Sequence, residues 1–198
     1  MNESATTMAI EDDCHERMLR GLRLVGAISG SLLPEDVAQA TMDVLKDQAD
    51  TCAGAMYLTE GRGSIREASR SLRPLAHWGM EMAEVDALST DAGLVAMVCG
   101  QAQARTAPRD RFVTLPSHAV PRYWALPLGV QPIPSGILLV RFATSDPGLA
   151  ALTSHETLAN LAGMSLDRAC LFVSLKDAYA RLTSVQNRLT EGEKQAAV

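Results

Sequence analysis

The feature that most constrains this chain is a row of residues that recurs every seven positions near its C-terminus. The row consists of Leu161, Arg168, Leu175, Leu182 and Leu189. The interleaved positions are filled by Ser165, Phe172, Tyr179 and Gln186. Two seam positions in every seven residues are typical of helices that pair in coiled coils. The sequence therefore predicts a long closing helix whose second half extends beyond the globular core.

A second seam is predicted near the N-terminus, in a helix that begins at about Asp13. Its members alternate at spacings of four and three: Met18, Leu22, Val25, Ser29 and Leu32. Pro34 ends this helix, because proline disfavours helical geometry in the residue before it. The two seams predict the domain organisation: a loosely ordered N-terminus over 1–12, a helix over 13–32, a globular domain over 33–170, and a coiled-coil-like helix with its tail over 171–198.

The composition is that of a soluble globular protein, with 47% hydrophobic and 21% charged residues. A net charge of −5 argues against nucleic-acid binding, which needs a surplus of Lys and Arg. The longest apolar run, Ile137 to Val140 extended by Phe142, is too short to span a bilayer, and the acidic N-terminus lacks a secretory signal. The four cysteines form no C-x-x-C pair, which suits a reducing compartment. We expect a cytoplasmic protein that binds neither nucleic acid nor membrane.

Between the two seams, short helices alternate with short strands. We expect a helix from Pro34 to Gly54, strands over 55–59, 72–78, 102–106, 123–130 and 135–143, and short helices over 80–88 and 91–99. Thr153, followed three residues later by Glu156, matches a capping box and predicts the start of the closing helix. This order predicts an α+β domain with a mostly antiparallel sheet between helical layers.

Six motifs resemble those of the GAF family, in order, over most of residues 20–175. They are Leu32-Leu33-Pro34-Glu35-Asp36-Val37, Gly93-Leu94-Val95 followed by Gly100-Gln101-Ala102, Asp110-Arg111-Phe112, Ala125-Leu126-Pro127-Leu128, Ser135-Gly136-Ile137-Leu138, and Thr153 and Glu156 with Leu161-Ala162. Each motif is short, but six in the right order and spacing are fairly specific.

The resemblance implies a GAF-like α+β fold with a central six-stranded antiparallel sheet and a ligand pocket on one face. The pocket would be roofed by the segment between residues 105 and 122. The long N- and C-terminal helices would pair in a parallel homodimer and pass a signal to an output domain, such as a histidine kinase, cyclase or transcription activator. We therefore expect a sensor of an unidentified small molecule, and not an enzyme.

The resemblance also indicates which residues would bind the ligand: Arg105, Arg109, His118, Tyr123, Trp124, Phe112, Met97 and Trp78. Arginines could hold a charged or polar ligand through guanidinium hydrogen bonds. The alternative for this segment is a local salt bridge between Asp110 and Arg111. Because neighbouring strand residues point to opposite faces, only one of Tyr123 and Trp124 should face the pocket. Core packing is the alternative role for these aromatic side chains.

The cofactor stays open. His118 lies close to where haem-binding GAF members place their axial histidine; its alternative is a loop histidine in solvent. Ser117 replaces the cysteine that anchors a bilin, so a covalent bilin is not expected. Val95 replaces the thiol of the sulfoxide-reducing members, and we expect Cys99 and Cys52 to be small buried hydrophobes. The remaining alternative is a structural dimerisation module with a degenerate pocket.

Overall fold

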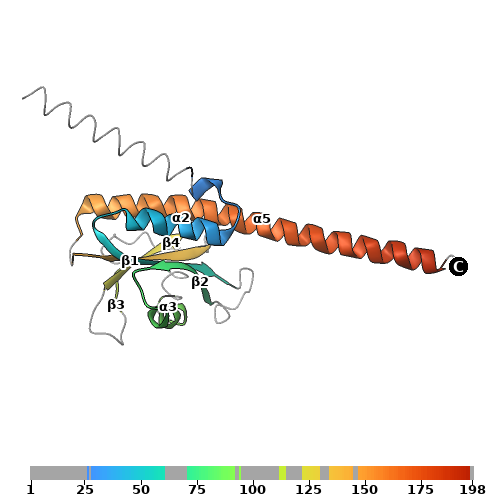
Figure 1. The fold of residues 1–198 in the computed structure, drawn as a ribbon, viewed down its shortest axis with the longest axis horizontal. Coiled ribbons are helices and arrows are strands. Elements are labelled where there is room, and N and C mark those ends of the chain that lie inside the picture. The colour runs from blue at the N-terminus through green and yellow to red at the C-terminus, as the bar shows by residue number, and fades with distance from the viewer. Residues whose placement is uncertain are drawn as a thin grey trace, which may run out of the picture.

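The computed structural model describes residues 26, 28–60, 71–91, 94, 112–114, 122–129, 134–144 and 147–196. The elements in these ranges are α2 (Pro34–Lys46), β1 (Thr51–Thr59), β2 (Leu72–Trp78), α3 (Met82–Ser89), β3 (Phe112–Thr114), β4 (Arg122–Leu128), β5 (Gly136–Phe142) and α5 (Leu149–Ala196). The described strands form one antiparallel sheet in the order β2-β1-β5-β4-β3. Helices α2 and α5 cover one face of the sheet, and α3 lies against the other (Figure 1).

The two central strands, β1 and β5, are buried on both faces, which explains their nearly continuous apolar sequences. Helix α2 begins with Pro34 in its first turn and with Glu35 and Asp36 at the positive end of its dipole. Its apolar side chains, among them Met42 and Leu45, are buried against the sheet and α5. We call this side of the sheet the helical face.

At Gly163 the backbone of α5 lies so close to the sheet that there is no room for a side chain. A Cβ atom on Gly163 would lie 2.2 Å from the backbone nitrogen of Gly129, which follows β4. Only glycine permits this approach of two backbones. Beside this contact, Ala159, Ala162 and Leu166 of α5 are buried in the core of the helical face.

The second half of α5 extends away from the globular domain (Figure 1). Every residue from Ser174 to Glu191 is exposed. Just before this extension, the Arg168 guanidinium donates hydrogen bonds to the backbone carbonyls of Ser29 and Ser31, and Nη2 lies 3.2 Å from the Ser31 oxygen. Arg168 therefore connects α5 to the end of the helical turn at residues 28–30.

Several predicted boundaries were wrong. Helix α5 begins at Leu149, and Thr153 lies inside it, where its hydroxyl donates to the Leu149 carbonyl instead of capping the helix. Helix α2 ends at Lys46, so β1 starts at Thr51 instead of near Ala55. Ser165 is buried in the domain, so it is not available for a seam between chains.

The described residues form five strands, whereas the resemblance implied six. The strand predicted over 102–106 lies outside the described residues, as does most of the helix predicted over 91–99. Cys52 was expected to be buried but is exposed. The reason is local: the pairing of β1 with β5 shifts register between Thr51 and Ala53, so Cys52 lies in a β-bulge.

Candidate functional site

The α3 face of the sheet carries a polar cluster around Arg141, which is the charged residue of the otherwise apolar β5. Its Nη1 donates to the Tyr123 hydroxyl at 3.2 Å, and its Nη2 donates to the Gly79 carbonyl at 3.1 Å. Its Nε lies 3.3 Å from the Sγ of Cys52. One guanidinium thus connects β5 to β4, to the bulge of β1 and to the turn before α3.

The turn at Gly79 brings its carbonyl close to Arg141. Gly79 has a φ of 67°, and a Cβ atom there would lie 2.4 Å from the Cys52 carbonyl oxygen. Both the positive φ and the close approach require glycine. The turn therefore depends on this residue type, as does the position of α3, which begins at Met82.

Two tyrosines from the sheet hold α3 in place. The Tyr123 hydroxyl donates to the Glu84 carboxylate, which also lies 3.8 Å from Nη1 of Arg141. The Tyr57 hydroxyl donates to the Val85 carbonyl at 3.1 Å. The Arg141 guanidinium carbon lies 5.7 Å from the centre of the Tyr123 ring, within the range of a cation–π contact. Arg141 and Glu84 keep about a quarter of their side chains exposed, so this is a partly solvated network.

Burial raises the pKa of Tyr57 and of Tyr123 above the ordinary value of 10.0, because a phenolate would lose its hydration there. At Tyr123 the hydrogen bond to Glu84 raises the pKa further, while the charge of Arg141 opposes the increase. Both phenols are neutral near pH 7, as an ordinary tyrosine is, and the raised pKa keeps them neutral to a higher pH. In that state they are hydrogen-bond donors on this face of the sheet.

The free energy of unfolding is expected to fall as the pH rises above about 10. A tyrosine whose pKa is higher in the folded state keeps its proton there while the unfolded chain loses it. The stabilisation is complete below the unfolded pKa and is lost as the pH rises toward the folded pKa. Urea midpoints measured at about pH 8 and about pH 11 would show the decrease. A double variant, Tyr57→Phe with Tyr123→Phe, should show a smaller decrease; an equal one would contradict this origin.

The structure separates several of the predicted ligand-binding residues. Tyr123 lies on the α3 face, whereas Trp124 is fully buried on the helical face between Phe142 and His155. Trp78 packs against the same helical face from β2. Tyr123 and Trp124 thus point to opposite faces of the sheet, as strand alternation predicts. Trp124 is a core residue of the helical face, and Tyr123 lies on the α3 face with the polar cluster.

Other predicted residues are described only in part. Phe112 pairs with Trp124 through the backbones of β3 and β4. Met97, Arg105, Arg109 and His118 lie outside the described residues. Their ligand-binding roles, and the haem alternative at His118, stay predictions.

Sequence reasoning missed Arg141, Glu84 and Tyr57 as site residues. One signal was available, since a single arginine within the apolar run from Ile137 to Phe142 has to find polar partners. Those partners come from elements far away in the sequence, so spacing alone does not identify them. Among the described residues, no three His, Cys, Asp or Glu side chains form a group that could hold a metal ion.

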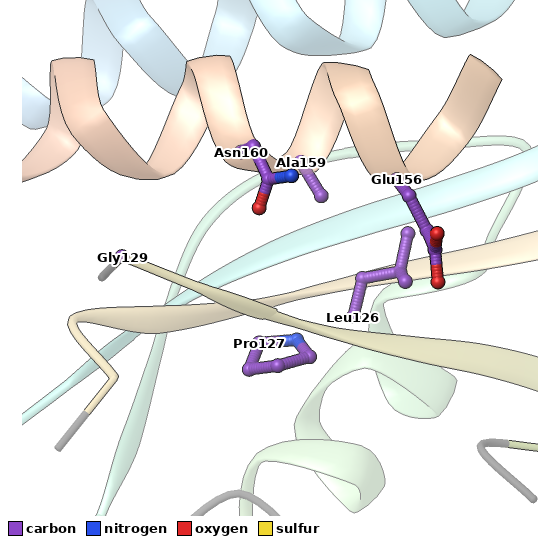
Figure 2. A pocket seen from close by; sticks show the side chains of 6 residues that line it. All are labelled: Leu126, Pro127, Gly129, Glu156, Ala159 and Asn160. Carbon is purple, nitrogen blue, oxygen red and sulfur yellow. The ribbon is translucent and has the colours of Figure 1, made fainter. Parts of the chain in front are cut away.

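A separate polar pocket lies between β4 and α5 on the helical face. It has a volume of about 200 Å³ and is lined by Leu126, Pro127, Gly129, Glu156, Ala159 and Asn160. Figure 2 shows Glu156 and Asn160 reaching from α5 toward the strand. The sheet separates this pocket from Arg141, so the two regions are distinct.

No family model and no curated protein matches this sequence. Solved structures with a similar fold include the GAF domain of a phosphoenolpyruvate-protein phosphotransferase from Acinetobacter, at 18% identity and a TM-score of 0.49, with 75% of this chain and 91% of that chain covered. Another is the GAF domain of a protein named as a sensor histidine kinase from Pseudomonas syringae pv. tomato, at 20% identity and a TM-score of 0.49, with 85% and 99% covered. A third is a GAF domain/HD domain protein from Geobacter sulfurreducens, at 13% identity and a TM-score of 0.46, with 74% and 98% covered.

All three are GAF domains, which is the family that the sequence motifs resemble. A ligand for this chain has to be sought in its own residues, because proteins of one fold bind different ligands. The chain's own elements form an α+β domain with an antiparallel sheet between helical layers.

Proposed function

We propose that this chain is a sensory or regulatory domain that binds a small molecule on the α3 face and transmits the binding event through α5 in a homodimer. We propose no catalytic role for it. The observation that carries the proposal is the continuity of α5, which packs on the sheet in its first half and presents an exposed apolar row in its second half.

The exposed row has the geometry of a coiled-coil seam. Starting from Leu161, spacings of three and four alternate through Met164, Arg168, Leu171, Leu175, Ala178, Leu182, Val185 and Leu189. Each interleaved position thus lies one residue before the predicted positions Ser165, Phe172, Tyr179 and Gln186. The shift is made because Ser165 is buried, whereas 61% of Met164 is exposed. Leu175 and Leu182 are 70% and 64% exposed, and burying a leucine contributes about 1.5–3 kcal/mol. A second copy in parallel would place each apolar residue opposite its own counterpart.

A short path of contacts joins the α3 face to α5. Tyr123 and Trp124 are neighbours in β4 and point to opposite faces of the sheet. Tyr123 belongs to the Arg141 cluster, and Trp124 packs edge-on against His155 of α5 at 6.4 Å between ring centres. A ligand that moved Tyr123 would therefore also move a side chain in contact with α5. It would change signalling only if it bound one dimer arrangement more tightly than the other.

We propose that α5 is a helix of a soluble protein. By length and composition alone, Leu149–Glu191 could cross a membrane. However, Leu158, Ala162 and Leu166 are buried in the core of the helical face. Part of the apolar content of the first half therefore belongs to the domain core. Arg168, within the same stretch, is hydrogen-bonded to backbone carbonyls.

Replacing Leu175 and Leu182 together with glutamate is expected to give a monomer. Both positions lie on the exposed seam, so each glutamate would place its charge opposite an identical charge in the dimer. Sedimentation velocity of the wild type and the double variant measures the result. The matched control is Ala180→Glu with Asn187→Glu, which adds the same charges on the side of the helix away from the seam. A seam variant that stayed dimeric, or a control that dissociated equally, would contradict the proposed seam.

A further inference from the structure

The helical turn at residues 28–30 meets α5 at Arg168, just before α5 leaves the globular domain. The Arg168 guanidinium donates to the backbone carbonyls of Ser29 and Ser31, and the neighbouring Ile28 is fully buried in the core of the helical face. We propose that this contact couples the N-terminal turn to dimerisation: it engages the charge of Arg168 within its own chain, and losing it weakens the homodimer. The inference rests on the homodimer proposed above and assigns it a controlling residue.

Arg168 is the one charged residue in the seam that runs from Leu161 to Leu189. Its neighbours in this row, Met164 and Leu171, are 61% and 63% exposed. In a parallel dimer Arg168 would lie opposite the same residue of the second copy, and like charges in a seam repel each other. Arg168 therefore opposes dimerisation unless its charge is engaged elsewhere.

Helix α5 itself supplies no opposite charge to Arg168. Side chains three and four positions apart are neighbours on a helix, and at these distances from Arg168 none is acidic: Met164, Ser165, Leu171 and Phe172. The partners that the guanidinium does have are carbonyls at the end of a helical turn. Such carbonyls lack partners within their helix and form the negative end of its dipole, which favours arginine.

This contact joins the two seams that were predicted separately from the sequence. Ser29 and Leu32 belong to the N-terminal seam, and Arg168 belongs to the seam of α5. The planar guanidinium carries several donors in a fixed arrangement, which suits it to hold two carbonyls at once. If the turn moves, Arg168 loses these partners and its charge returns to the seam. By reciprocity, dimerisation should stabilise the turn.

Arg168→Leu tests the proposal because it should change the turn and the dimer in opposite directions. Without the guanidinium, the amides of Ser31 and Leu32 should exchange faster with deuterium. The dimer should nevertheless bind about tenfold more tightly, because the seam loses a charge and gains a leucine. Sedimentation equilibrium measures the dissociation constant. A purely structural Arg168 would give the faster exchange with an unchanged or weaker dimer, which would overturn the proposal.

The matched control is Lys176→Leu, which removes a positive charge and adds a leucine outside the seam. It should leave both the dissociation constant and the exchange at Ser31 unchanged. If Lys176→Leu strengthened the dimer as much as Arg168→Leu, general charge or hydrophobicity would explain the effect, and the role of Arg168 would be wrong.

A double-mutant cycle separates the coupling from the seam itself. Ile28→Ala loosens the turn without altering Arg168, so it should weaken the wild-type dimer about threefold to tenfold. In the Arg168→Leu background it should have no effect on the dimer. Equal weakening in both backgrounds would contradict the coupling. A monomeric wild type would contradict the homodimer itself, whereas a dimeric wild type insensitive to Arg168→Leu would contradict only the present inference.

Discussion

Replacing Trp124 with alanine is expected to lower the free energy of unfolding by about 3–5 kcal/mol. Trp124 is fully buried, and its ring lies 6.0 Å from that of Phe142 and 6.4 Å from that of His155. The substitution would leave a cavity where β4, β5 and α5 meet, and backbones held in a sheet cannot close around it fully. Urea denaturation followed by far-ultraviolet circular dichroism measures the change.

The control for this substitution is the neighbouring residue on the other face. Tyr123→Phe keeps the ring and removes only the hydroxyl between Arg141 and Glu84, so it should cost about 1 kcal/mol. If Trp124→Ala cost no more than Tyr123→Phe, the helical face would not be the main core of the domain.

Gly163→Ala is expected to lower the free energy of unfolding by about 1–3 kcal/mol, even though alanine stabilises a helix more than glycine does. The new Cβ would lie 2.2 Å from the Gly129 nitrogen and 2.9 Å from the Leu128 carbonyl carbon. Both are backbone atoms, so relief requires α5 to move away from the end of β4. The denaturation midpoint measures the loss, and the far-ultraviolet spectrum should stay helical because only the docking of α5 is disturbed.

Gly148→Ala is the matched control, since it makes the same change just before α5. A Cβ atom on Gly148 would meet no atom within 4 Å, and surface substitutions of this kind change stability by less than about 0.5 kcal/mol. If both alanine variants were equally stable, the close contact between Gly163 and Gly129 would not be what positions α5.

Three of the strands could be predicted from the sequence because their signals are local, whereas β3 was not predicted. The strand at 72–78 was predicted with its observed bounds, and the strands around 122–128 and 136–142 within two residues. The start of α5 could not be predicted from Thr153, because a capping pattern inside a helix looks the same as one at its end. Tertiary packing of the turn from Leu149 onward decides between the two.

The candidate site was harder to predict than the fold. Tyr123 could be identified because a strand next to an expected pocket has to expose one of two neighbouring aromatic residues. Glu84 and Gly79 could not, because they meet Arg141 only after α3 folds onto the sheet, about sixty residues away in the chain. The exposed Cys52 depended on a bulge in β1, and a shift in strand register leaves no mark in residue composition.

The unbroken length of α5 determines what kind of movement it could pass on. Its 48 residues contain no proline and correspond to a rod of about 70 Å at 1.5 Å per residue. A continuous helix can carry a rotation about its own axis from one end to the other. Successive residues are about 100° apart around a helix. A rotation of α5 by that angle about its own axis would therefore bring Lys176 to the seam in place of Leu175. The angle of the helix, rather than its position along the axis, would then decide whether two chains stay together.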